Sequence, residues 1–140
     1  MELSKSMPGK LKILLIEDDR DDVEFLKVAL DDNRVHYSME TLMRGDLVPK
    51  WLSDQHERPD IFIMDLNLPK MHGREVICKI KEHPDFRTVP LIVLTTSSLP
   101  EDIEYCMRNG ADKFISKPST TEGFTVLVKD ILETAALKKH

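Results

Sequence analysis

The sequence predicts a single α/β domain in which five parallel strands alternate with five helices. The chain has 140 residues, which is the size of one domain with its own hydrophobic core. Its longest unbroken apolar runs are four residues long and lie at Ile13–Ile16, Ile61–Met64 and Leu91–Leu94. Short runs of this kind are typical of strands that are buried on both faces. Apolar residues with helical spacing separate the runs, and such alternation indicates a parallel sheet with helices on both faces.

The first half of the domain is expected to hold two strands and two helices. Residues 1–10 lack periodicity and are predicted to be a flexible leader, so the domain is expected to span residues 11–137 with no effector domain. The helix after the first run has apolar residues at Val23, Leu26 and Leu30. A weaker strand follows at residues 36–41, and a short helix at 46–53 accommodates Pro49 in its first turn.

The second half of the domain is expected to continue the alternation. The helices after the second and third runs have apolar residues at Val76, Ile77 and Ile80 and at Ile103, Cys106 and Met107. A weaker fifth strand is expected at residues 113–116. The last helix has the longest apolar stripe of the chain, at Phe124, Leu127, Val128, Ile131 and Ala135.

Composition excludes several classes of protein. The formal net charge of −5 argues against a protein that binds the nucleic-acid backbone. No apolar stretch approaches the roughly 18 residues of a membrane span, and the N-terminus lacks the apolar region of a secretory signal. Cys78 and Cys106 form neither a disulfide framework nor a zinc-site spacing. We therefore expect a cytoplasmic protein with reduced thiols, with no nucleic-acid or membrane partner.

The residues that follow the strands carry the polar chemistry of the sequence. Glu17 and Asp18 come directly after the first run, and Asp65 directly follows the second. Thr95 follows the third run, and Lys117 follows the expected fifth strand. Because ligands of open α/β sheets bind beyond the carboxyl ends of the strands, we expect these side chains to meet in one site.

Such a set of side chains is suited to a metal ion and a phosphoryl group. Neighbouring carboxylates raise each other's pKa unless a cation compensates their charge. Mg²⁺ is the expected cation because it prefers oxygen ligands and keeps several water molecules. A lysine and a hydroxyl opposite the metal would hold a phosphoryl group, and Asp65 could then be the nucleophile that forms an aspartyl phosphate. Asp19 is expected instead to cap the following helix.

Several motifs together resemble the receiver domain of two-component response regulators. They are Glu17-Asp18, Asp65 in MDLNLPKMHG, Thr95 in LIVLTTSS, and Lys117-Pro118. The successive separations of 47, 30 and 22 residues between the second acid, the central acid, the threonine and the lysine fit that family. The resemblance covers residues 11–137. The segments DLNLPKMHGREV and VLTTSSLPEDI are more narrowly similar to stand-alone regulators that are paired with bacterial phytochrome kinases.

The resemblance implies a flavodoxin-like fold with strand order 2-1-3-4-5 and a role for each site residue. Asp65 would accept a phosphoryl group from a phosphohistidine of a sensor histidine kinase. Asp18 and Asp65 would bind Mg²⁺ through their carboxylates. Glu17 would act mainly through a bound water molecule, and Asn67 would contribute its backbone carbonyl. The domain's own chemistry would be limited to autophosphotransfer and slow self-dephosphorylation.

The resemblance also implies how the domain switches. Lys117 would contact the phosphoryl oxygens, and Thr95 would move toward them after the transfer. Phe114 stands at the position of the family's switch aromatic. The Lys117–Pro118 peptide bond is expected to be cis, which would aim the lysine into the pocket.

Apolar residues outside the inward stripes suggest surfaces for partners. At 100° per residue, Tyr105 and Val126 lie opposite the apolar stripes of their helices. Together with Phe114 they are predicted to form an outward patch on the side where the family commonly dimerises. Phe25 and Val28 widen the apolar side of the first helix, the face that such domains usually offer to a histidine kinase.

Two other functions compete with a phosphorylatable receiver. A Mg²⁺-dependent phosphohydrolase with an aspartyl nucleophile is the main alternative. Such an enzyme usually needs a second acid two residues after the nucleophile, and here that residue is Asn67, which cannot act as a general acid. A pure interaction module with an inactive site is disfavoured because the set of site residues is complete.

Overall fold

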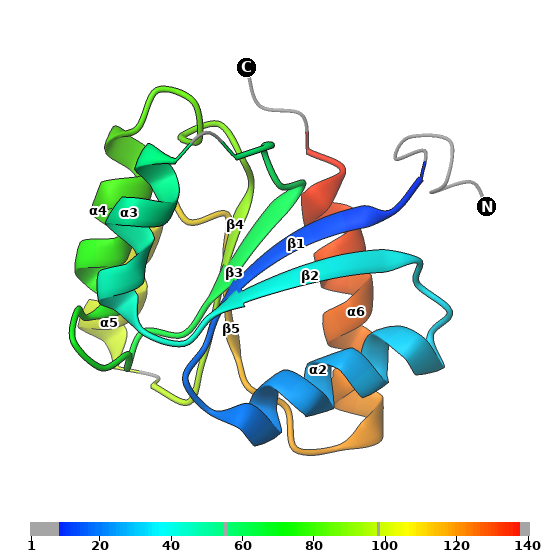
Figure 1. The fold of residues 1–140 in the computed structure, drawn as a ribbon. Helices are drawn as coiled ribbons and strands as arrows, with labels where there is room; N and C mark the ends of the chain where they lie inside the picture. Colours follow the sequence, from blue (N-terminus) through cyan, green and yellow to red (C-terminus); the bar gives the residue numbers. More distant parts are fainter. Residues whose placement is uncertain (1–8, 55, 98, 138–140) are drawn as a thin grey trace.

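The computed structural model describes residues 9–54, 56–97 and 99–137, so most of the expected leader lies outside the described residues. Strands and helices alternate along the chain (Figure 1). The elements are β1 (Leu11–Ile16), α2 (Arg20–Asp32), β2 (Tyr37–Leu42), a 3₁₀ helix (Gly45–Leu47), α3 (Val48–Ser53), β3 (Ile61–Met64), α4 (Gly73–Glu82), β4 (Leu91–Thr95), α5 (Pro100–Arg108), β5 (Lys113–Ser116) and α6 (Thr121–Ala135). None of the helices in this part of the chain has the length and apolar character of a membrane span.

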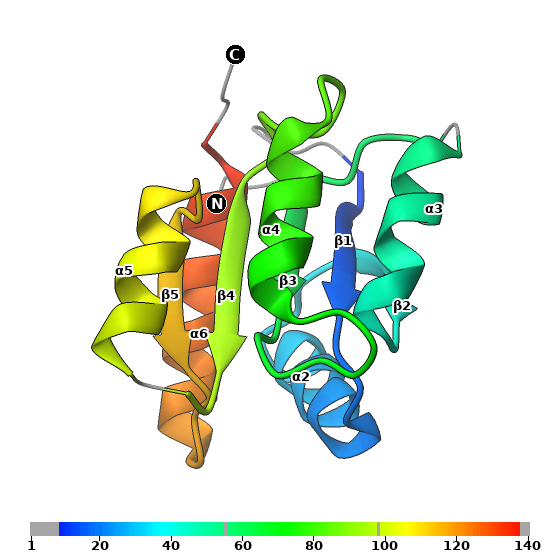
Figure 2. The same ribbon diagram turned by 90° about the vertical axis from the view of Figure 1, so that its left-hand side faces the viewer.

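The strands form one parallel sheet in the order β2-β1-β3-β4-β5, which confirms the predicted fold class. Helices α2 and α6 cover one face of the sheet, and α3, α4 and α5 cover the other (Figures 1 and 2). Each face has its own cluster of buried apolar side chains. Every residue of β3 and β4 is buried, which explains why these strands appear in the sequence as unbroken apolar runs.

The two strands with the weakest sequence signals are the edge strands. Strand β2 alternates between half-buried and exposed residues over its first four positions, and β5 has three half-buried residues followed by an exposed one. An edge strand has a neighbour on one side only, so fewer of its side chains need to be apolar.

The start of α2 agrees with the prediction for Asp19. Its carboxylate accepts hydrogen bonds from the backbone N–H groups of Asp21, at 2.8 Å, and Asp22, at 3.2 Å. This N-cap ends the loop after β1 and places Asp22 in the first helical turn, close to the carboxyl ends of the strands.

The predicted apolar stripe of α5 is wrong. Of its residues only Cys106 is buried, whereas Ile103 is 37% exposed and Met107 is 43% exposed. The buried side of α5 carries Asp102 instead, and the carboxylate of Asp102 accepts hydrogen bonds from Arg74 of α4. A polar contact between the two helices therefore takes the place that the periodicity assigned to apolar residues.

Candidate functional site

Backbone hydrogen bonds fix the site residues just beyond the strands. The N–H of Glu17 donates a hydrogen bond to the carbonyl of Leu42 in β2 at 3.0 Å, and the N–H of Asp65 donates to the carbonyl of Ile16 at 3.0 Å. The N–H of Lys117 donates to the carbonyl of Thr95, also at 3.0 Å. Each bond continues a parallel ladder by one step, so the side chains that follow the strands project from the same end of the sheet.

Three of the predicted carboxylates come together at this end. Glu17, Asp18 and Asp65 each offer one oxygen, and these oxygens lie within 4.8 Å of one another. Glu17 is 3% exposed and Asp65 is 6% exposed, whereas Asp18 is open to solvent. Hard oxygen donors with an open side are suited to Mg²⁺ or a similar divalent cation, which retains water in the remaining positions.

The lysine of the site contacts three carboxylates at once. The Nζ atom of Lys117 lies 3.0 Å from Oε1 of Glu17 and 2.9 Å from Oδ2 of Asp65. It also lies 2.6 Å from Oδ2 of Asp22, a partner that sequence reasoning missed. In the sequence, the one feature that could have indicated this contact is the place of Asp22 in the first turn of α2, shortly after the Glu17–Asp18 pair.

The surroundings of these groups shift their pKa values in different directions. Burial is the largest cause that raises the pKa of Glu17, to about 7, although Lys117 acts against it. Burial also acts to raise the pKa of Asp65, but hydrogen bonds from Thr95, Lys117 and the N–H of Asn67 outweigh it and hold the pKa below its usual value. For Lys117, burial acts to lower the pKa, but the three carboxylates raise it, so the lysine stays charged.

The side chain of Thr95 is fully buried on the Asp65 side of the site. Its oxygen accepts a hydrogen bond from the N–H of Ser97 at 3.2 Å, and its hydroxyl takes part in the hydrogen bonding that lowers the pKa of Asp65. From the family resemblance, Thr95 was expected to move toward the phosphorylation site only after phosphoryl transfer. In the structure the threonine already interacts with the unmodified aspartate.

The cis Lys117–Pro118 bond expected from the resemblance is wrong, because the structure has no cis peptide bond in its described residues. The trans form of an X–Pro bond is ordinarily the more stable one. The hydrogen bond from Lys117 to Thr95 extends β5 by one residue, and this strand direction brings the lysine to the carboxylates without a sharp bend.

The predicted outward patch is only partly exposed. Val126 is 59% exposed on α6, whereas Phe114 is half-buried and packs against the core beneath α3, α4 and α5. The placement of Tyr105 on the outer side of α5 is wrong. Its hydroxyl lies 3.1 Å from Sγ of Cys78, and its ring lies beside Arg74, so this side chain contacts α4.

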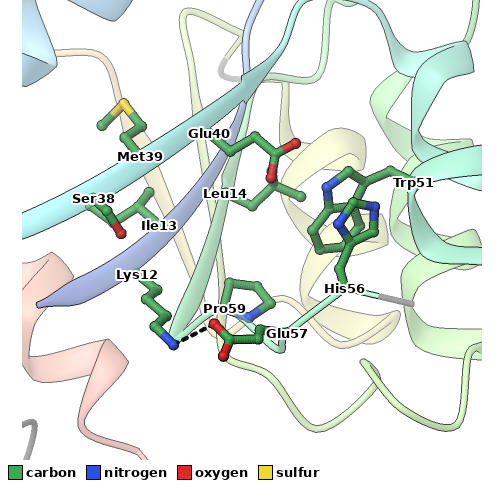
Figure 3. Close-up of a pocket in the computed structure, with 10 residues that line it drawn as sticks. All are labelled: Lys12, Ile13, Leu14, Ser38, Met39, Glu40, Trp51, His56, Glu57 and Pro59. Carbon is green, nitrogen blue, oxygen red and sulfur yellow. Dashed lines mark hydrogen bonds and ion pairs between the residues drawn. The ribbon is translucent and has the colours of Figure 1, made fainter. Parts of the chain in front are cut away.

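A separate cavity of about 470 Å³ lies at the other end of the strands (Figure 3). It is bounded by the β1–β2 face, α3 and the segment before β3, and Lys12 pairs with Glu57 at its rim at 2.7 Å. Trp51 and His56 stack in its wall, with ring centroids 4.3 Å apart. None of the predicted site residues lines this cavity, so it has no part in the carboxylate site.

Comparison with known proteins adds an independent line of evidence. A family model described as the response regulator receiver domain matches residues 13–129. The response regulator Rcp1 of Synechocystis sp. is 32% identical over 142 residues, which cover 95% of this chain and 96% of the relative. The similarity therefore includes all the strand ends that carry the site.

Solved structures give the same result in three dimensions. The phosphorylated cyanobacterial phytochrome response regulator RcpA matches with a TM-score of 0.80 at 32% identity, covering 89% of this chain and 93% of the other. The Mn²⁺-bound form of Rcp1 matches with a TM-score of 0.76 at 30% identity, covering 86% and 90%.

Proposed function

Because the chain belongs to the response regulator receiver domain family, we propose that Asp65 is the aspartate that accepts the phosphoryl group of two-component signalling. The observation that carries this proposal is the position of its carboxylate. It is buried at the end of a central strand, 2.9 Å from the Lys117 ammonium, and one of its oxygens lies within 4.8 Å of oxygens of Glu17 and Asp18. We assign the receiver domain to residues 11–137, a range supported by the family match and by the extent of the sheet and helices.

In the proposed reaction, a carboxylate oxygen of Asp65 attacks the phosphorus of a phosphohistidine on the kinase. The new bond joins this oxygen to phosphorus, the phosphorus–nitrogen bond breaks, and the imidazole leaves with the electron pair. The Lys117 ammonium and the Thr95 hydroxyl both interact with Asp65 and would donate hydrogen bonds to the phosphoryl oxygens. Attack by water on the resulting acyl phosphate would give slow self-dephosphorylation.

The donor set of the site fits Mg²⁺. Asp18 and Asp65 would bind the ion through their carboxylates, Glu17 mainly through water, and Asn67 through its backbone carbonyl. When bound, the cation supplies positive charge that offsets the carboxylates and the incoming phosphoryl group. The Mn²⁺-bound form of Rcp1, a relative of similar sequence, supports a divalent ion here.

A phosphohydrolase is the weaker alternative. Its leaving group would need a general acid near Asp65, and the residue two positions along is Asn67, whose N–H donates to Asp65 at 3.3 Å. Signalling through one modified side chain needs no such acid. We therefore propose that the protein's own chemistry is restricted to phosphoryl acceptance and its slow reversal.

The exposed side of α2 supports a protein partner. Phe25 and Val28 are 54% and 53% exposed on α2, and they border a cavity of about 670 Å³ that extends to Pro118 and Phe124. We propose that a sensor histidine kinase binds there. The similarity to RcpA, a cyanobacterial phytochrome response regulator, supports a kinase of the phytochrome type. We also propose a cytoplasmic location, which is the usual one for a receiver domain.

Phosphorylation by acetyl phosphate with Mg²⁺ tests the proposed function. Intact-mass spectrometry is expected to detect one added phosphoryl group on the wild type and none on Asp65→Asn. Asp46→Asn is the matched control, because this exposed acid pairs with the neighbouring Arg44 and lies outside the site. Full modification of Asp65→Asn would refute the assignment.

A further inference from the structure

One acidic side chain between α4 and α5 receives hydrogen bonds from two different segments. Asp102 lies in the first turn of α5 and is largely buried. Its Oδ1 accepts from Nε of Arg74 at 3.0 Å and from Nη2 of Arg74 at 2.5 Å. Its Oδ2 accepts from the hydroxyl of Ser97 at 2.7 Å. The two oxygens therefore tie together α4 and the loop that follows β4.

The Ser97 end of this arrangement leads to the phosphoacceptor. The N–H of Ser97 donates to the side-chain oxygen of Thr95 at 3.2 Å. Thr95 ends β4, and Asp65 follows the neighbouring strand β3, so this bond fixes the Thr95 side chain near the phosphoacceptor, where its hydroxyl contributes to lowering the pKa of Asp65. Hydrogen bonds thus join Thr95, beside the phosphoacceptor, through Ser97 to Asp102.

The Arg74 end leads to the surface. The guanidinium lies over the ring of Tyr105, 4.8 Å from its centroid, and the Tyr105 hydroxyl lies 3.1 Å from Sγ of Cys78. The Arg74 side chain is 37% exposed. A change in the loop after β4 would therefore alter contacts at the groove between α4 and α5, where a partner can detect it.

We propose that Asp102 is a positioning residue for phosphoryl binding, which holds Ser97, and through it Thr95, so that Thr95 faces Asp65 before any phosphoryl group arrives. Arg74 anchors Asp102 and extends the same contacts to the α4–α5 groove. This gives the protein a route from the site to its surface that does not pass through Phe114. The proposal rests on the proposed function of Asp65, and it concerns how the chain prepares that site.

If Asp102 positions Thr95 in this way, loss of its contacts should lower the apparent affinity of the site for the phosphoryl group. If only a fraction of the molecules holds Thr95 toward Asp65, the apparent affinity falls by that fraction. The series of contacts keeps this fraction high in the wild type. Loosening it lowers the affinity for a phosphoryl mimic, while the carboxylates that bind Mg²⁺ are unaltered.

Titration calorimetry with beryllofluoride and Mg²⁺ tests the proposal. Ser97→Ala removes the link to the loop, and Asp102→Asn removes the charge that pairs with Arg74. Each is expected to weaken beryllofluoride binding about fivefold or more, the lower end of typical coupling between sites. The double variant should bind beryllofluoride about as well as whichever single variant binds it less tightly. The two losses should not add, because both changes break the same series of contacts. Glu101→Gln, an exposed neighbour on the same helical turn, is expected to bind like the wild type.

Mg²⁺ binding without beryllofluoride separates positioning from a general loss of structure. It is expected to be unchanged in Ser97→Ala and Asp102→Asn, since a disturbed fold would weaken both ligands together. Wild-type affinity for beryllofluoride in both variants, multiplicative losses in the double variant, or a parallel loss of Mg²⁺ binding would each overturn the proposal. If the wild type itself fails to bind beryllofluoride, or Asp65→Asn binds it equally well, the proposed function fails instead.

Nuclear magnetic resonance tests the route to the surface. Arg74→Met keeps the apolar stem but removes the charged end that contacts Asp102 and Tyr105. On addition of beryllofluoride, amide shifts in the α4–α5 groove are expected to shrink in this variant, while those around Phe114 persist. Undiminished shifts in the groove would show that the signal reaches it by another path.

Discussion

The Nζ atom of Lys117 lies 2.9 Å from Oδ2 of Asp65, although the two residues are 52 positions apart and follow different strands. The same ammonium group contacts Glu17 and Asp22, so it is the positive charge shared by a group of acids at the end of the sheet. In the proposed reaction this charge would turn toward the phosphoryl oxygens. The lysine therefore has a structural role as well as a chemical one.

Removal of Lys117 is expected to destabilise the protein and to prevent efficient phosphorylation. Lys117→Ala leaves the buried carboxylates of Glu17 and Asp65 without their cation, and the loss of one partner of a buried ion pair costs about 3 kcal/mol or more. Urea unfolding measures this loss, and Mg²⁺ should restore part of it because the ion also offsets the acids. Lys113→Ala, on the same strand, is the control: its pair with Asp130 is longer, at 3.4 Å, and more exposed. Equal stability of the two variants would contradict this role.

Asp18 and Asp19 are expected to separate metal binding from helix capping. Asp18→Ala should lose most of the Mg²⁺ affinity with little change in stability, because this exposed carboxylate is a ligand candidate. Asp19→Ala should keep the affinity but lose about 1 kcal/mol of stability, since it removes the N-cap of α2. Calorimetry and urea unfolding of both variants measure the two effects. The reverse pattern would show that the two acids have been assigned the wrong roles.

Cys106 is expected to be unreactive in the native protein. Burial is the main cause that raises the pKa of its thiol, to about 11, and nearby Asp102 adds to the shift. At pH 8 the thiol is therefore almost entirely protonated, and the reactive thiolate is scarce. Alkylation by iodoacetamide followed by peptide mass spectrometry should modify Cys106 only after unfolding. Rapid modification at pH 8 without denaturant would contradict the burial of this residue.

A homodimer through α5, β5 and α6 stays a prediction, and the exposure of its residues shows which substitution can test it. Phe114 is half-buried, so an aspartate there would disturb the fold, whereas Val126 is 59% exposed. Val126→Asp is expected to weaken self-association in analytical ultracentrifugation, with or without beryllofluoride. Val28→Asp is the matched control, because Val28 is similarly exposed, at 53%, but lies on α2, outside the surface formed by α5, β5 and α6. If wild type and both variants sediment alike under all conditions, this surface does not form a dimer.

The sequence by itself determined the central strands and the residues that follow them. Strands β3 and β4 are covered by helices on both faces, so their residues must be apolar, and an unbroken run such as Ile61–Met64 is readily recognised. A parallel sheet brings the carboxyl ends of its strands to one edge. The meeting of Glu17, Asp65 and Lys117 therefore followed from order along the chain alone.

Only the tertiary structure decided which side chains meet between helices. Asp22 reaches Lys117 across 95 positions of sequence, and Arg74 reaches Asp102 across 28. A pattern of apolar residues cannot show such pairs, because it records which face of a helix is buried but not which polar group on a neighbouring element can satisfy a charge there. For the same reason periodicity turned Tyr105 outward, whereas the groove beside Arg74 and Cys78 holds it against α4.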